Sequence, residues 1–152
     1  MSNYKRISLG NIKTLGRVTL HDDLALTGSE VSINELPAGV AVPFVHAHKQ
    51  NEEVYLILSG QGLFYLDGEE LTVREGDVLR VDPAARRCIK SDSNSSLRFV
   101  CIQTKANSLT QFTETDGVPA EWLRSSAEVL LRTLISSTLN FSLSEIALNV
   151  SS

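Results

Sequence analysis

The 152-residue chain is long enough for one domain with a single core, and 42% hydrophobic and 21% charged residues are typical of a globular protein. A net charge of −4 without a basic cluster argues against nucleic acid as a partner. No apolar run approaches the roughly 18 residues of a membrane-spanning helix, the start carries no secretory signal, and two cysteines are too few for a disulfide framework. We therefore expect a cytoplasmic protein without a membrane partner.

Between about residues 17 and 104 the apolar residues recur with the period of two that is typical of strands. Asp67-Gly68 separates two such runs and is a strong hairpin signal. Turn residues separate the other runs, and no helix is expected to interrupt them. The pattern predicts an all-β sandwich or barrel of antiparallel strands. The runs expected to be strands are 31–36, 53–58, 63–66, 71–73, 77–81 and 97–102.

The composition changes near Gly117, which divides the chain into residues 1–116 and 117–152. Leucines at helical spacing after Pro119 predict a helix over about 120–138. This C-terminal helix either covers an open side of the barrel or docks on a second subunit. Residues 140–152 form either an added strand or a tail, and the sequence does not decide between them.

Potential metal ligands gather in one short segment. His46 and His48 are two residues apart, so on a strand their side chains project to the same face, about 7 Å from each other. A carboxylate from Glu53, or from its neighbour Glu52, completes a set of two histidines and one acid that leaves coordination positions open. His21, the third histidine of the chain, lies in a polar run and is expected to be exposed.

This segment resembles the first motif of the cupin superfamily: Gly, five residues, His-x-His, three or four residues, Glu, six residues, Gly. Here Gly39 lies one residue further from His46 than the pattern has it. Four residues separate His48 from Glu53 and six separate Glu53 from Gly60, which favours Glu53 over its neighbour. The resemblance covers about half of the chain. It implies a double-stranded β-helix, the jelly-roll barrel of the cupins, with a divalent metal site inside.

The second cupin motif (Gly, five residues, Pro-x-Gly, two residues, His) is only partly present. Six residues separate Gly76 from Pro83, Ala85 replaces the second glycine, and Cys88 stands where the family has a fourth ligand, histidine. A Cys88 thiolate would complete a site suited to tetrahedral zinc. Alternatively Cys88 is a small buried apolar residue beside a three-ligand site, which we favour. In a third interpretation the barrel has lost its metal.

Four further residues are candidates for binding a substrate. If Glu53 points inward, strand alternation directs Tyr55 to the same side. Gln50 is either a neutral oxygen donor or an ordinary loop residue. Arg86 and Arg87, which the resemblance places near the barrel mouth, either clamp a carboxylate or phosphate or are solvent-facing charges.

Two functions remain open. The first is a metal-dependent enzyme, a dioxygenase or isomerase, in which Fe, Mn, Ni or Zn binds a small oxygen-bearing substrate. The second is a non-catalytic barrel for a small-molecule ligand, with structural metal or none. The resemblance also implies a homodimer.

Overall fold

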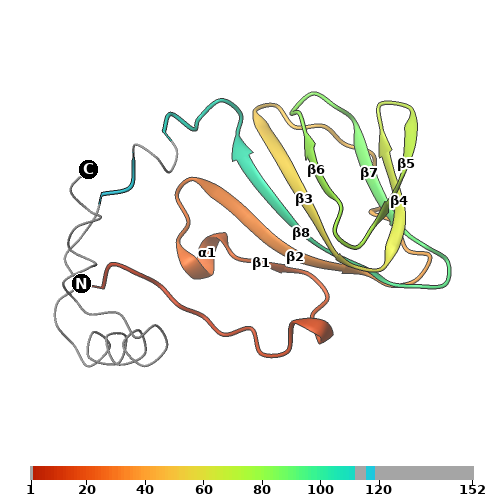
Figure 1. Ribbon diagram of the computed structural model, residues 1–152, viewed down its shortest axis with the longest axis horizontal. Coiled ribbons are helices and arrows are strands. Elements are labelled where there is room, and N and C mark those ends of the chain that lie inside the picture. The colour runs from red at the N-terminus through yellow and green to blue at the C-terminus, as the bar shows by residue number, and fades with distance from the viewer. Residues whose placement is uncertain (1, 112–115, 119–152) are drawn as a thin grey trace, which may run out of the picture. The chain divides into compact units, whose positions relative to one another are not determined.

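The computed structural model describes residues 2–111 and 116–118. Strands dominate this part of the chain, and within residues 2–111 helix is limited to two short turns (Figure 1). The elements are η1 (Ile12–Thr14), β1 (Val18–Thr19), α1 (His21–Leu24), β2 (Ser29–Leu36), β3 (Asn51–Ser59), β4 (Gln61–Leu66), β5 (Glu69–Arg74), β6 (Val78–Val81), β7 (Arg87–Ser91) and β8 (Leu97–Lys105).

The strands form two antiparallel sheets, a five-stranded sheet in the order β1-β2-β8-β3-β6 and a three-stranded sheet in the order β5-β4-β7. β8 lies between β2 and β3 and pairs with both along its length. The chain passes from the first sheet to the second at Gly60, between β3 and β4, where the backbone has a φ of 82°. The pairing of β3 with β8 is irregular just before this corner.

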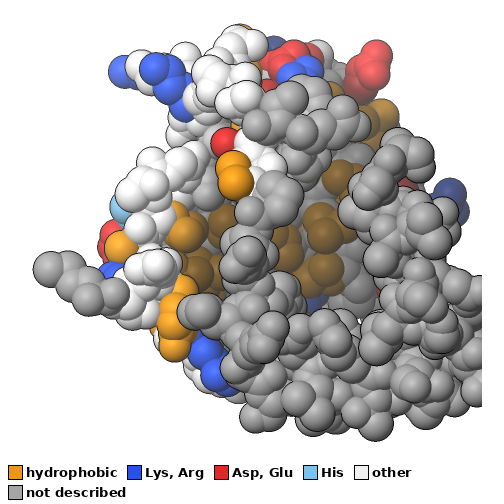
Figure 2. Space-filling model, turned by 60° about the vertical axis from the view of Figure 1, so that its left-hand side comes forward, with side chains coloured by type: hydrophobic (Ala, Val, Ile, Leu, Met, Phe, Trp, Pro, Cys, Tyr) orange, Lys and Arg blue, Asp and Glu red, His pale blue; other side chains and the backbone are white. Residues whose placement is uncertain are grey.

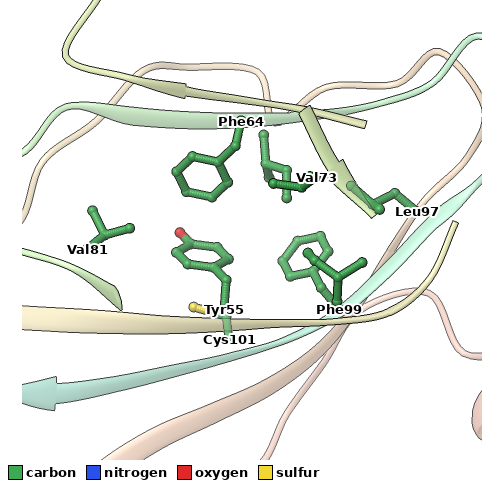
Figure 3. Close-up of a cluster of buried hydrophobic side chains, with 9 residues drawn as sticks. Tyr55, Phe64, Val73, Val81, Leu97, Phe99 and Cys101 are labelled. Carbon is green, nitrogen blue, oxygen red and sulfur yellow. The ribbon is translucent and has the colours of Figure 1, made fainter. Parts of the chain in front are cut away.

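The core lies between the two sheets, as Figure 3 shows. Tyr55 packs edge-on against Phe64, with ring centroids 4.9 Å apart, and also contacts Phe99. Such edge-to-face pairs add to the stabilisation that burial alone provides. The buried apolar cluster consists of Tyr55, Ile57, Val81, Leu97, Phe99 and Cys101 from the larger sheet and Phe64, Val73 and Ile89 from the smaller one.

The structure confirms all six expected strands and changes some of their boundaries. β4 and β5 form the predicted hairpin, with positive φ at both Asp67 and Gly68. The expectation that no helix interrupts this region was wrong at α1, a single turn over His21–Leu24. The sequence patterns did not predict β7, which only the family resemblance suggested.

The chain divides into two units, Met1–Thr110 and Gln111–Ser152. Both sheets belong to the first unit. The helix expected over about 120–138 and the alternatives for residues 140–152 lie outside the described residues. Within the described residues, no helix has the length and apolar character needed to cross a membrane.

Candidate metal centre

The segment that contains the two histidines runs along β7 without forming a regular strand. His46 and Arg87 exchange two backbone hydrogen bonds, of 3.1 and 2.8 Å, in an isolated antiparallel bridge. The backbone N–H of His48 donates to the carbonyl of Pro83 at 2.8 Å. Although the segment is not a regular strand, these alternating bonds hold both histidines on one side of it, as the spacing of two residues predicts for extended backbone.

The structure brings His46, His48 and Glu53 together. One potential ligand atom from each lies within 4.8 Å of the others. The two imidazole rings are nearly perpendicular, with centroids 5.3 Å apart, and His48 Nε2 lies 3.0 Å from Glu53 Oε1. Two donors at about 2.1 Å from one ion and at right angles to each other would be about 3 Å apart. The spacing therefore suits neighbouring ligands of one ion as well as a direct hydrogen bond.

Glu53 is almost completely buried, at 2% exposure, and both of its oxygens have close neighbours. Tyr55 Oη donates to Oε2 at 2.7 Å, and Arg87 Nε donates to the same oxygen at 2.8 Å. Oε1 faces His48 and lies 3.5 Å from the thiol of Cys101. The carboxylate is thus held by Oε2, which leaves Oε1 directed toward the histidines.

These surroundings shift the ionisation of the buried groups. Burial alone would raise the pKa of Glu53, but the hydrogen bonds from Tyr55 and Arg87 and the Arg87 charge outweigh it, so this pKa lies below its usual value. Burial lowers the pKa of His46, which favours the neutral imidazole that binds metals. Burial, reinforced by the Glu53 charge, raises the pKa of Cys101 to about 12, so its thiol stays protonated at neutral pH.

The three residues lie on the wall of a cavity of about 540 Å³. Figure 2 shows hydrophobic side chains gathered on one face of the described part of the chain. Such a volume accommodates a small molecule. The lining is largely apolar near the core and includes polar residues from β2 and β8; its members are Arg17, Ser32, Asn34, Glu35, Leu36, Ala41, Val42, Pro43, Phe44, His46, His48, Glu53, Tyr55, Cys88, Ile89, Phe99, Cys101 and Gln103.

Of the residues predicted to bind a substrate, Tyr55 lines the cavity, but Gln50 is exposed and lies outside the lining. Cys88 also lines the cavity, but its thiol donates to the carbonyl of Val42 at 3.2 Å, and it does not belong to the three-residue donor group. Glu52 pairs with Arg80 at 3.1 Å instead of facing inward.

Neither interpretation of Arg86 and Arg87 describes Arg87. This side chain is 0% exposed and lies outside the cavity lining, so it is not a solvent-facing charge. Its guanidinium binds Glu53 and donates to the carbonyls of Pro83 and Ala85. Arg86 is exposed and also outside the lining. The β7 residue that contacts Glu53 is therefore a buried cation, Arg87, and not a fourth metal ligand.

Several cavity residues were not found by sequence reasoning. Ser32 and Asn34 lie on the β2 face that lines the cavity, Gln103 and Cys101 come from β8, and Arg17 precedes β1. The alternation in β2 separates a polar from an apolar face, but it does not tell which face lines the cavity. The register of β2 on β8 supplies that information.

Comparison with known proteins identifies relatives for most of the described chain. A family model described as a cupin domain matches residues 33–103. The crystal structure of a cupin protein from Bacteroides fragilis has a TM-score of 0.76 and 54% sequence identity, and the match covers 80% of this chain and 100% of that chain.

Two sequence relatives are more distant. An uncharacterized protein of Methanocaldococcus jannaschii is 33% identical over 87 residues, which are 56% of this chain and 68% of that protein. The oxalate-binding protein of Thermotoga maritima is 32% identical over 68 residues, which are 45% of this chain and only 55% of that protein.

Proposed function

This chain belongs to the cupin family and has an all-β jelly-roll fold, and we propose that its cavity binds a divalent metal ion through His46, His48 and Glu53. A small oxygen-bearing ligand would bind to that ion. The observation that carries this proposal is the convergence of three potential ligand atoms within 4.8 Å on the cavity wall. Two neutral imidazoles and one carboxylate are a common set for Fe, Mn, Ni or Zn.

The residues around the three donors fit a metal ion. His46 Nδ1 is buried and has no hydrogen-bond partner among the described residues, and such an orphaned nitrogen is rare in a folded protein. Glu53 Oε2 is already occupied by Tyr55 and Arg87, so the carboxylate cannot rotate freely and Oε1 is fixed beside His48. Partners of this kind orient ligands before a metal binds.

A bound metal would supply a Lewis acid with open positions for ligand oxygens. The residues of the chain would do the rest: the cavity wall would surround the ligand, and Arg87 and Tyr55 orient Glu53. Oxalate, which the Thermotoga maritima relative is named for binding, is a small anion with oxygens suited to chelation. We propose small carboxylates as the ligand class. Dioxygenase or isomerase turnover stays a prediction for the metal-loaded protein.

The proposed site predicts that untagged protein purified without chelators contains close to one equivalent of metal. We expect His46→Ala/His48→Ala to lose that metal, because one carboxylate alone does not hold a divalent ion at low concentration. His21→Ala is the matched control, since His21 is exposed and pairs with Asp22 outside the site. Elemental analysis of the three proteins measures the result. Metal-free wild-type protein that also refuses added Fe, Mn, Ni and Zn would contradict the proposal.

A second prediction concerns Cys88. We expect Cys88→Ser to keep the metal content and metal affinity of the wild type, because its thiol bonds to a backbone carbonyl and lies outside the three-donor group. A serine hydroxyl can donate to the same carbonyl. Competition against a chromophoric chelator measures the affinity. A clear loss of affinity would instead assign Cys88 as a fourth ligand.

One observation favours a second candidate function, a ligand-binding cavity without metal. Arg87 already neutralises Glu53, and His48 can donate directly to Glu53 Oε1. The buried acid is therefore satisfied without an ion. The metal analysis distinguishes the two functions.

A further inference from the structure

We infer that Arg17 is the anion-binding residue of this cavity, and that the ligand carries a second negatively charged group, a carboxylate or phosphate, remote from the group that meets the His46, His48 and Glu53 centre. The inference rests on the proposed function for the metal-bound end of the ligand. The inference adds the charge and the length of that ligand, which the three donor residues alone do not specify.

The sheet register places Arg17 across the larger sheet from Glu53. Glu53 on β3 lies opposite Gln103 on β8, and Val18 on β1 lies opposite Ile33 on β2. β1 is therefore three strands from β3, about 14 Å along the sheet. Arg17 and Glu53 nevertheless line the same cavity. The cavity thus extends from the candidate metal centre to the N-terminal edge of the sheet.

The backbone on both sides of Arg17 is fixed to β2. The N–H of Glu35 donates to the carbonyl of Gly16 at 2.9 Å, and the N–H of Leu20 donates to the carbonyl of Val31 at 2.9 Å. With Val18 paired to Ile33 between these bonds, the backbone of Arg17 cannot move away from the cavity without breaking the edge of the sheet. A residue held in this way binds at a lower entropic cost than one on a free arm.

The charge of Arg17 is available to a ligand. Among the described residues Arg17 forms no ion pair, whereas Glu35, the acid beside it in the lining, is paired with Arg98 at 2.6 Å. Arg17 is the one arginine or lysine among the lining residues that the structure describes. It is exposed, so it lies where the cavity meets solvent and can meet an incoming anion.

Neutral polar side chains continue from Arg17 toward the metal centre. Asn34 and Ser32 line the cavity from β2, and Gln103 lines it beside Glu53. Opposite this polar side the wall is apolar, with Val42, Phe44 and Ile89 as examples. A short-chain dicarboxylate or a phosphorylated hydroxy acid matches such a cavity: a chelating end, an apolar chain and a distant anion. Oxalate is too short to meet both ends.

The test titrates metal-loaded wild-type protein by calorimetry with oxalate, succinate, glutarate and adipate, and with butyrate as a probe without a second anion. We expect at least one longer diacid to bind more tightly than butyrate. In Arg17→Gln this diacid should lose about tenfold or more in affinity, because a charge-assisted hydrogen bond is lost, while butyrate should bind as before. Arg86→Gln, an exposed arginine outside the lining, is the matched control and should bind like the wild type.

Metal content is measured on the same samples, which separates this inference from the proposed function. Metal-loaded protein whose diacid affinity is equal in Arg17→Gln and wild type overturns the role of Arg17 and leaves the metal site intact. An equal loss in Arg86→Gln, or no binding of any diacid, also overturns it. Protein that binds no metal but shows Arg17-dependent diacid binding supports Arg17 and contradicts the metal site.

Discussion

Arg87→Met is expected to destabilise the protein by about 3–5 kcal/mol, because it leaves the buried carboxylate of Glu53 without its counter-charge. Arg87 and Glu53 are 0% and 2% exposed, and their contact is 2.8 Å. A methionine side chain occupies most of the space of the aliphatic part of arginine. The loss of stability therefore reflects the unpaired charge more than a cavity. Urea denaturation of the metal-free protein measures the free energy of unfolding.

Two further variants identify the cause of that loss. Arg87→Met/Glu53→Gln removes both charges and should recover much of the stability, since a neutral amide still accepts the hydrogen bond from Tyr55. Arg80→Met breaks the exposed pairs with Glu52 and Asp82 and should cost less than about 1 kcal/mol. A double variant as unstable as Arg87→Met would show that packing, not the unpaired charge, explains the effect.

The Arg87→Met variant also connects stability to the proposed metal site. With Arg87 absent, a divalent ion at His46, His48 and Glu53 becomes the counter-charge of the carboxylate. Added metal should therefore raise the midpoint of unfolding more in Arg87→Met than in the wild type, since a ligand stabilises the state it binds. An unchanged midpoint in saturating metal would argue against an ion at these residues.

Much of the strand pattern could be predicted from the sequence because it depends on local signals. The Asp67-Gly68 turn determines the hairpin, and the period of two places Glu53, Tyr55 and Ile57 on one face of β3. All three are buried in the structure, at 2%, 5% and 1% exposure. Each of these predictions needs only neighbours a few residues apart.

The role of Arg87 could not be predicted in this way. The family pattern assigns the fourth ligand by counting, and the chain has an extra residue between Gly76 and Pro83. Because successive side chains on a strand point to opposite sides, Arg87 and Cys88 cannot both be directed at Glu53. Only the pairing of β7 with the segment around His46, far away in the sequence, determines that Arg87 is the one.

Arg17 was missed for a related reason. An arginine in an N-terminal segment looks like any exposed charge until the register of β1 on β2 and of β2 on β8 is known. The polar residues Ser32 and Asn34 would be assigned to solvent by the usual rule for half-buried strands. They line the polar side of the cavity instead, so the rule fails where a functional site replaces the core.

Gly60→Ala is expected to destabilise the protein by about 3 kcal/mol or more, through two effects that act together. The backbone at Gly60 has a φ of 82°, a conformation that side chains disfavour. A methyl group there would also collide with the carbonyl oxygen of Ser96, a backbone atom that cannot move without disturbing the start of β8. Urea denaturation measures the change.

Gly68→Ala separates the two effects, since Gly68 also has a positive φ, of 103°, but a methyl group there would meet nothing within 4 Å. This control should cost only about 1–2 kcal/mol, the strain alone. Because Gly60 ends the strand that carries Glu53 and Tyr55, Gly60→Ala should also weaken metal binding, which Gly68→Ala should leave unchanged. Equal destabilisation by the two substitutions would show that the close contact with Ser96 is not what requires glycine at this corner.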